Sequence, residues 1–181
     1  ELIAKENNIL FIVDEIATGF GRTGNMFAFE TSKIEPDIIC LGKALTGGVI
    51  SLASVVSTDK IYEAFLSDND EDALMHGPTY MSNPLACAAA NASIELFITE
   101  PRLKQVKNIE KILNNGLKQC TDISSVKDVR IKGALGVIQI NKMHNLSWLR
   151  KRFVEEGVWI RPFLDVVYLM PSFTISKNNL D

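Results

Sequence analysis

The sequence contains few cysteine and histidine residues, which limits the kinds of site it can form. Three cysteines and two histidines occur among 181 residues. The cysteines Cys40, Cys87 and Cys120 are odd in number, far apart and outside any Cys-x-x-Cys motif. A secreted disulfide scaffold is therefore not expected, and a reducing compartment, the cytoplasm, is. His76 and His144 lack metal-ligand spacing, so no metal site is predicted.

Long hydrophobic runs and an excess of positive charge are missing as well. Unbroken apolar runs such as residues 9–13 are far too short to cross a bilayer. The formal net charge is −3, so a basic surface for nucleic acid is not expected. Membrane and nucleic-acid partners are therefore not predicted. Hydrophobic residues at 46% and charged residues at 23% are typical of a globular protein with a sizeable core.

The first half of the chain has the pattern of an α/β domain. Residues 9–13 are apolar without alternation, as in a parallel-sheet strand buried on both faces. Asn83 and Pro84 suit the N-cap and first turn of a helix rich in small residues, which we expect to pack closely on a neighbour. The predicted elements are strands at residues 9–13, 38–41 and 52–56 and helices at residues 59–66 and 84–98.

The second half has the pattern of a small α+β layer, with helices packed on an antiparallel sheet. Its predicted elements are helices at residues 101–120 and 146–156 and strands at residues 126–131, 135–140, 158–162 and 166–169. We therefore predict two domains, residues 1–105 and residues 106–181. Residues 1–8 resemble the end of a helix and residues 176–181 the start of another, so we expect the chain to be a piece of a longer protein.

Two side chains follow neighbouring predicted strands at the point where ligands bind in open α/β sheets. Asp14 comes directly after the first strand, and Lys43 stands in a glycine-rich loop after the second. A partly desolvated lysine at such an edge can form a Schiff base, and a nearby acid can hold the protonated ring of pyridoxal phosphate. The same pattern also fits a turn-capping acid and a solvated surface lysine.

Two further groups have the chemistry of anion sites. Gly77, Pro78 and Thr79 precede a helix, where backbone N–H groups and a hydroxyl can hold a phosphate, although a plain turn fits equally well. Arg161 precedes Pro162, which favours an extended backbone, so its guanidinium could bind a carboxylate through two hydrogen bonds. A surface ion pair is the alternative for Arg161.

Glycines at positions 19, 21 and 24 match Gly-x-Gly-x-x-Gly, but they lack the strand-turn-helix context of a dinucleotide site. We interpret them as loop glycines.

Three motifs in order nevertheless resemble the signatures of the class III pyridoxal-phosphate aminotransferases. They are residues 14–24 (DEIATGFGRTG), residues 36–48 (PDIICLGKALTGG) and residues 76–88 (HGPTYMSNPLACA). The resemblance implies the fold type I of pyridoxal-phosphate enzymes: part of a large domain with a mixed or parallel sheet, and a small carboxyl-terminal α+β domain.

The resemblance also implies roles toward a pyridoxal 5'-phosphate cofactor. Lys43 would be the catalytic lysine that bonds to the cofactor and moves a proton. Asp14 would pair with the ring nitrogen. Thr79, with Gly77 and Pro78, would contact the cofactor phosphate of the partner subunit across a homodimer interface.

A narrower resemblance concerns the substrates. Residues 159–163 (WIRPF) and 168–171 (YLMP) are similar to the branch of the family that acts in biotin biosynthesis. Members of that branch take an amino group from S-adenosyl-L-methionine and pass it to 8-amino-7-oxononanoate. Arg161 would bind the carboxylate of the acceptor, with Gly77 close by, and Arg22 would lie near the substrate entrance.

Two other functions stay open. The chain could belong to another class III aminotransferase that acts on ornithine, 4-aminobutyrate or a diamine. It could also be an inactive carboxyl-terminal piece, or a half that pairs with another chain, because it looks like less than half of a full-length member. The missing front part would supply the aromatic ring that stacks on the cofactor and part of the phosphate site, so we expect the piece alone to be inactive.

Overall fold

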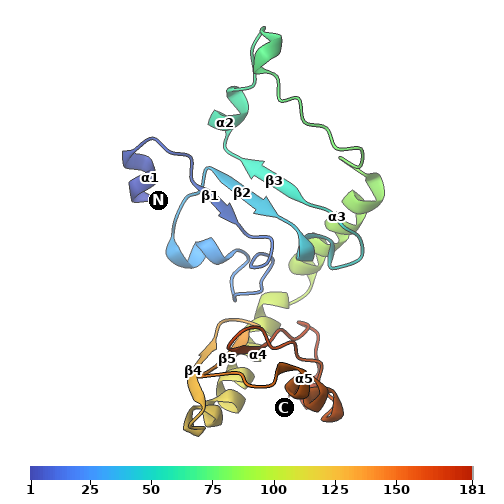
Figure 1. Ribbon diagram of the computed structural model, residues 1–181. Helices are drawn as coiled ribbons and strands as arrows, with labels where there is room; N and C mark the ends of the chain where they lie inside the picture. Colours follow the sequence, from blue (N-terminus) through green and yellow to red (C-terminus); the bar gives the residue numbers. More distant parts are fainter. Residues whose placement is uncertain (181) are drawn as a thin grey trace. The chain divides into compact units, whose positions relative to one another are not determined.

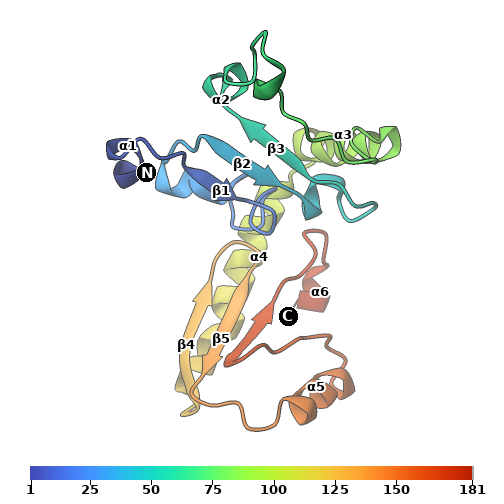
Figure 2. The same ribbon diagram turned by 45° about the horizontal axis from the view of Figure 1, so that its top comes forward.

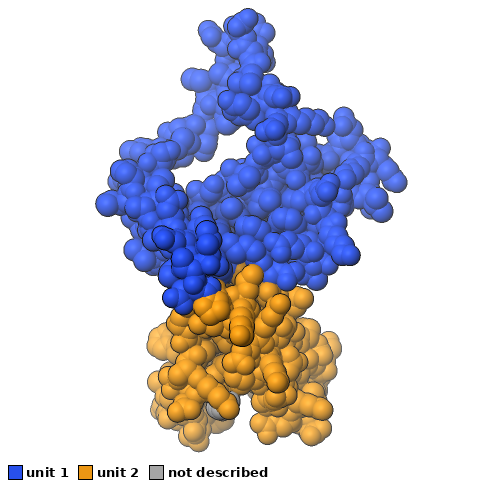
Figure 3. Space-filling model, turned by 180° about the vertical axis from the view of Figure 1, so that it is seen from behind, with its two compact units in different colours: residues 1–20, 25–100 blue, residues 21–24, 101–181 orange. Residues whose placement is uncertain are grey.

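The computed structural model of the chain describes residues 1–180 and has mixed α/β content (Figure 1). Its contacts divide it into two compact units, coloured separately in Figure 3. Unit 1 contains residues 1–20 and 25–100, and unit 2 contains residues 21–24 and 101–181. The division into domains of residues 1–105 and 106–181 stays a prediction.

Unit 1 is built on a three-stranded sheet with the order β1-β2-β3. The strands are β1 (Ile12–Asp14), β2 (Ile38–Leu41) and β3 (Ser54–Ser57). β1 pairs with β2 in parallel, and β2 pairs with β3 antiparallel, so the sheet is mixed. The bounds predicted for β2 are confirmed.

The predicted burial of the first strand on both faces is wrong for this chain. Ile9 is 60% exposed and Ile12 is 55% exposed. Strand side chains point to the two faces of a sheet, so burial on both faces requires other elements packed over each face. The apolar side chains of residues 9–13 favour a buried strand, but the described residues leave several of them exposed.

Helix α3 (Pro84–Thr99) packs its small residues against the loop after β2. Asn83 caps it, since the Asn83 carboxamide oxygen accepts hydrogen bonds from the N–H groups of Leu85 and Ala86. Pro84 occupies the first turn, as predicted. The remaining elements of the unit are short: α1 (Leu2–Glu6), α2 (Asp59–Glu63), and the 3-10 turns η1 (Ala28–Ser32), η2 (Lys43–Thr46) and η3 (Asp70–Asp72). The core of unit 1 consists of Phe20, Leu41, Leu45 and Ala90.

Unit 2 places a helix on an antiparallel sheet with the order β4-β5-β6 (Figure 2). Its core consists of Val106, Ile109 and Leu113 from one face of α4, together with Ala134. The buried positions follow the helical period expected from the sequence. The elements are α4 (Arg102–Leu117), η4 (Lys118–Asp122), β4 (Val126–Ile131), β5 (Gly136–Ile140), α5 (Leu146–Glu155), β6 (Val166–Leu169) and α6 (Lys177–Leu180).

The strand predicted at residues 158–162 is wrong. These residues belong to no strand, and the pairing begins later with an isolated bridge between Phe163 and Val166. Trp159 is 84% exposed, and Pro162 has no N–H group to donate to a strand neighbour. By contrast, the bounds predicted for β4 and β6 are confirmed.

Candidate active site

Asp14 ends strand β1 and Glu15 follows it, and the structure gives these two acids different surroundings. Glu15 is 2% exposed, and its carboxylate accepts hydrogen bonds from the Thr18 hydroxyl and, at 2.9 Å, from the Phe29 N–H. Asp14 is exposed, and one of its oxygens accepts a bond of 2.9 Å from the Ile16 N–H. Glu15 therefore holds the loop that follows, while Asp14 keeps its second oxygen available for a ligand.

Lys43 begins the 3-10 turn η2 with a backbone φ of +46°, in the left-handed region. A residue other than glycine costs about 1–3 kcal/mol in such a conformation and adopts it only where its surroundings impose it. Strain of this kind gathers at functional sites, but Lys33 also has a left-handed φ, of +51°, so the angle marks Lys43 only together with its place directly after β2. The predicted partial desolvation of Lys43 is wrong for this chain, because the side chain is exposed.

Asp14 and Lys43 share one edge of the sheet in unit 1. β1 and β2 run parallel, with Asp14 opposite Cys40, so both strands end at the same edge. Gly42 lies between β2 and Lys43, and a Cβ atom there would stand 3.3 Å from Ile16 Cγ2. The chain after β2 thus passes close to the chain after β1. Within residues 1–180 neither Asp14 nor Lys43 forms a salt bridge, so an unpaired acid and an unpaired lysine belong to the same edge.

Sequence reasoning missed the side chains that hold the lysine loop. Ser93 Oγ on α3 donates a hydrogen bond of 3.0 Å to the carbonyl oxygen of Ala44. Thr46, which is 2% exposed, donates through its hydroxyl to the carbonyl oxygen of Ile50. The signal that could have identified Ser93 is the spacing of Ala86, Ala90 and Ser93, which places small side chains on one face of the helix.

The segment around Gly77, Pro78 and Thr79 is exposed and lies in an irregular arm between α2 and α3 (Figure 1). In the described part of the chain, the Thr79 hydroxyl has no hydrogen-bond partner, and no side-chain bond joins the segment to Asp14 or Lys43. Exposed apolar side chains flank it, since Met75 is 91% exposed and Tyr80 is 78% exposed. An arm of this composition is suited to contact another surface.

Arg161 in unit 2 is exposed and has no acidic partner among residues 1–180. Its neighbour Pro162 is fully buried, and the carbonyl oxygen of Pro162 accepts a bond of 3.4 Å from Arg150. The bridge between Phe163 and Val166 closes the turn that follows. The backbone at Arg161 is thus fixed on one side, and its guanidinium is free to bind an anion.

Arg22, predicted to lie near the substrate entrance, uses its guanidinium within unit 2. It donates hydrogen bonds to the carbonyl oxygens of Ala134, at 3.0 Å, and Pro171, at 2.9 Å. It also lies 4.6 Å from the centre of the Phe173 ring. Burial lowers the pKa of the Arg22 guanidinium from its ordinary value. These contacts give Arg22 a structural task, and its role at the substrate entrance stays a prediction.

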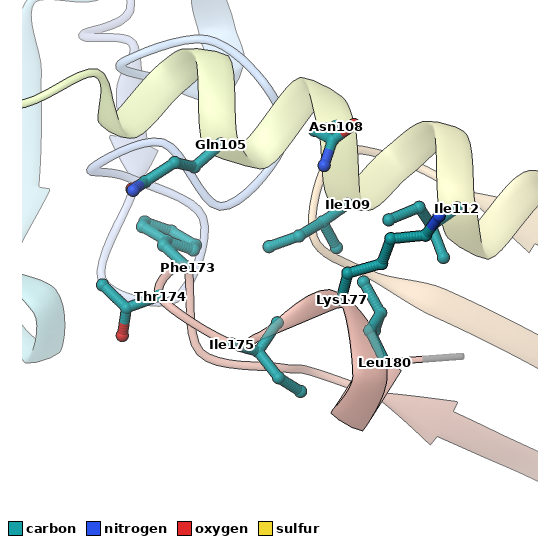
Figure 4. Close-up of a pocket in the computed structure, with 9 residues that line it drawn as sticks. All are labelled: Gln105, Asn108, Ile109, Ile112, Phe173, Thr174, Ile175, Lys177 and Leu180. Carbon is teal, nitrogen blue, oxygen red and sulfur yellow. The ribbon is translucent and has the colours of Figure 1, made fainter.

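Unit 2 also contains a cavity of about 150 Å³ between α4 and the chain after β6 (Figure 4). Ile109 and Ile112 lie on one side of it, and Phe173, Ile175 and Leu180 lie on the other. None of the predicted site residues lines this cavity. Among residues 1–180, no helix is long and apolar enough to cross a membrane, and no group of three or more His, Cys, Asp or Glu side chains could hold a metal ion.

Comparison with known proteins gives a consistent family. The family described as Aminotransferase class-III matches residues 1–181. A curated relative from Buchnera aphidicola (subspecies Acyrthosiphon pisum), named adenosylmethionine-8-amino-7-oxononanoate aminotransferase, is 47% identical over 180 residues. That alignment covers 99% of this chain and 42% of the relative. The chain therefore spans less than half the length of this relative.

Solved structures agree in fold. The crystal structure of adenosylmethionine-8-amino-7-oxononanoate aminotransferase from Methanocaldococcus jannaschii matches with a TM-score of 0.90 and 35% identity, over 98% of this chain and 44% of that chain. An omega-transaminase from Pseudomonas jessenii, in complex with PMP, matches with a TM-score of 0.91 and 26% identity, over 99% of this chain and 42% of that chain. The fold therefore fits both enzymes equally, and only the identity differs between them.

Proposed function

The chain belongs to the class III aminotransferases, and from this premise we propose that the full-length protein passes an amino group from S-adenosyl-L-methionine to 8-amino-7-oxononanoate. The product is 7,8-diaminononanoate, in biotin biosynthesis. The observation that carries the transaminase chemistry is the shared sheet edge with Asp14 and Lys43. The choice of substrates is supported by the names of the relatives at 47% and 35% identity.

The residues at this edge fit pyridoxal 5'-phosphate. An exposed amine can bond covalently to an aldehyde, and an exposed carboxylate can hold a proton on a ring nitrogen. When bound, the cofactor supplies an electron-withdrawing ring that stabilises negative charge on the substrate carbon. Lys43 holds the cofactor and then moves a proton between substrate atoms, while Asp14 keeps the ring nitrogen protonated. The place of Lys43 after β2, at the edge where β1 also ends, supports its assignment as the catalytic group.

The phosphate contact is proposed to come from the exposed arm. Thr79 donates its hydroxyl to the cofactor phosphate, and Gly77 and Pro78 shape the approach. The arm belongs to one subunit and the cofactor to its partner, so the site is shared in a homodimer. The support is the exposure of the arm and the absence of a hydrogen-bond partner for the Thr79 hydroxyl within residues 1–180. A location in the cytoplasm is proposed from the cysteine pattern.

Arg161 is proposed to bind the carboxylate of 8-amino-7-oxononanoate. Its guanidinium is exposed and unpaired in the described part of the chain, and a bidentate pair with a carboxylate would fix the acceptor's orientation. Gly77 and Arg22 are also proposed to lie near the substrates. A Cβ atom added at Gly77 would meet no atom within 4 Å, so the space beside this residue is open.

The decisive experiment is a single-turnover spectrum of the full-length protein loaded with pyridoxal phosphate. S-adenosyl-L-methionine is added alone, and the visible absorbance of the lysine-bound cofactor is followed. Loss of that absorbance, with formation of the amine form of the cofactor, supports the proposed donor.

Two other outcomes are informative. An unchanged spectrum, with a response to ornithine, 4-aminobutyrate or a diamine, would instead indicate another aminotransferase of the class. A protein that never develops the visible absorbance would contradict the enzyme assignment and favour an inactive piece.

A further inference from the structure

The backbone of Lys43 is held from both sides by contacts that do not involve its own side chain. On one side, Gly42 packs beside Ile16, with room for no larger residue without displacement. On the other side, the carbonyl oxygen of Ala44 accepts the hydrogen bond of 3.0 Å from Ser93. Leu45, which is 6% exposed, anchors the same turn in the core of unit 1. A left-handed lysine between two fixed neighbours cannot relax by moving either of them.

Thr46 closes the loop that follows. Its hydroxyl oxygen lies 2.5 Å from the carbonyl oxygen of Ile50 and 3.5 Å from that of Lys43. A hydroxyl has one proton to donate, so the shorter contact to Ile50 takes it. The bond spans Gly47 and Gly48, whose φ angles of +62° and +85° make the reversal possible. Without it, the end of η2 would be tied to the loop by backbone bonds alone.

We propose that Ser93 and Thr46 are positioning residues that hold Lys43 in its left-handed conformation and so aim its amine at the cofactor. The inference rests on the proposed function, because it assumes that Lys43 bonds to pyridoxal phosphate. Ser93 lies on α3, far from Lys43 in the sequence. Helix α3 therefore takes part in the chemistry through the backbone of the lysine loop.

The test measures covalent capture of pyridoxal phosphate by the full-length apoprotein, with no substrate present. The rate is followed by absorbance, and the modified lysine is identified after borohydride reduction and peptide mapping. Ser93→Ala keeps a good helix former in α3, and Thr46→Val keeps the shape of the side chain without its donor. The control is Thr99→Val. Thr99 is an exposed residue of α3, and its hydroxyl donates a hydrogen bond of 2.9 Å to the carbonyl oxygen of Glu95.

We expect Ser93→Ala and Thr46→Val each to slow capture about fivefold, the effect of one net hydrogen bond. Rates are normalised to the folded fraction. Thr46→Ser restores the donor and the wild-type rate, and Thr99→Val leaves the rate unchanged. If Thr46→Val does not fold, the rate of capture by Ser93→Ala tests the proposal alone, against the same expected fivefold decrease.

Two failures are distinguishable. Wild-type capture by Ser93→Ala, while Lys43→Ala captures nothing, would overturn the positioning role and leave the proposed function intact. Wild-type capture by Lys43→Ala would overturn the proposed function itself, because another residue would then hold the cofactor.

Discussion

At the scale of single residues, Asp14 and Arg161 each stand beside a buried neighbour that anchors the backbone. Asp14 is exposed and the adjacent Glu15 is buried, because successive side chains at a strand end point to opposite sides. Arg161 is exposed and the adjacent Pro162 is fully buried. The buried partner fixes the backbone, and the exposed partner is left free to bind a ligand.

Replacement of Lys43 by alanine tests the covalent assignment. In the full-length protein loaded with pyridoxal phosphate, Lys43→Ala should lose the visible absorbance of the lysine-bound cofactor, because no amine remains at the sheet edge. Its circular dichroism should stay unchanged, since the side chain is exposed. Lys60→Ala, an exposed lysine on α2, is the matched control and should retain the absorbance.

Replacement of Asp14 by asparagine separates binding from chemistry. The amide keeps the shape and can still accept the Ile16 N–H, so cofactor affinity should change little. Turnover should fall on the order of 100-fold, because the ring nitrogen loses the charge that keeps it protonated. Steady-state kinetics and a cofactor titration measure the two quantities. Full turnover in Asp14→Asn, equal to that of the exposed control Asp68→Asn, would rule out this role.

Arg161 should act in acceptor binding. Arg161→Ala should raise the KM for 8-amino-7-oxononanoate by about 10- to 100-fold, which is the value of a charge-assisted hydrogen-bonded pair. The half-reaction with S-adenosyl-L-methionine should be unaffected. Arg152→Ala, an exposed arginine on α5 paired locally with Glu155, is the control. An unchanged KM for the acceptor would contradict the assignment.

At the scale of elements, the turn between β4 and β5 docks on residues 22–24. The Arg22 guanidinium donates a hydrogen bond to the carbonyl oxygen of Ala134. The Gly133 N–H donates a hydrogen bond of 2.8 Å to the Glu110 carboxylate on α4. The last residues of the motif at residues 14–24 thus make their contacts within unit 2. Gly24 therefore serves a close backbone approach to Gly133.

Gly133 should tolerate no side chain. Its φ is +57°, and an added Cβ would lie 2.5 Å from Gly24 N and from Thr23 C. Gly133→Ala should lower the free energy of unfolding by about 3 kcal/mol, through backbone strain and overpacking. Gly116→Ala on α4 is the control, since no atom lies within 4 Å of its added Cβ, and it should raise stability by about 0.5–1 kcal/mol. Chemical denaturation followed by circular dichroism measures both, and equal stabilities would contradict the prediction.

At the scale of the whole molecule, the sheet of unit 1 presents apolar side chains to solvent. Ile12 on β1 is 55% exposed and Val55 on β3 is 67% exposed. Unpaired edge strands with apolar faces favour association.

The 181-residue chain expressed alone should therefore self-associate and should not capture pyridoxal phosphate as the full-length protein does. Light scattering over a dilution series measures the association, with the full-length protein as control. A stable monomer at all concentrations would show that the exposed face is tolerated.

Most of the local elements and the order of the motifs can be predicted from the sequence. The bounds of β2, β4 and β6 and the Asn83 cap of α3 follow from strand-forming runs and cap chemistry, which act between near neighbours. The placement of Asp14 and Lys43 at one edge follows as well, because parallel strands end together.

The surroundings of those residues depend on the tertiary structure. It buried Glu15 and exposed Asp14, and it gave Arg22 backbone partners far along the chain. It also placed Lys43 in a left-handed conformation, and it left residues 158–162 without a strand. These cases share one cause. Burial and backbone strain depend on segments that are distant in the sequence, whereas a local pattern shows only which secondary structure and which degree of burial its own residues favour.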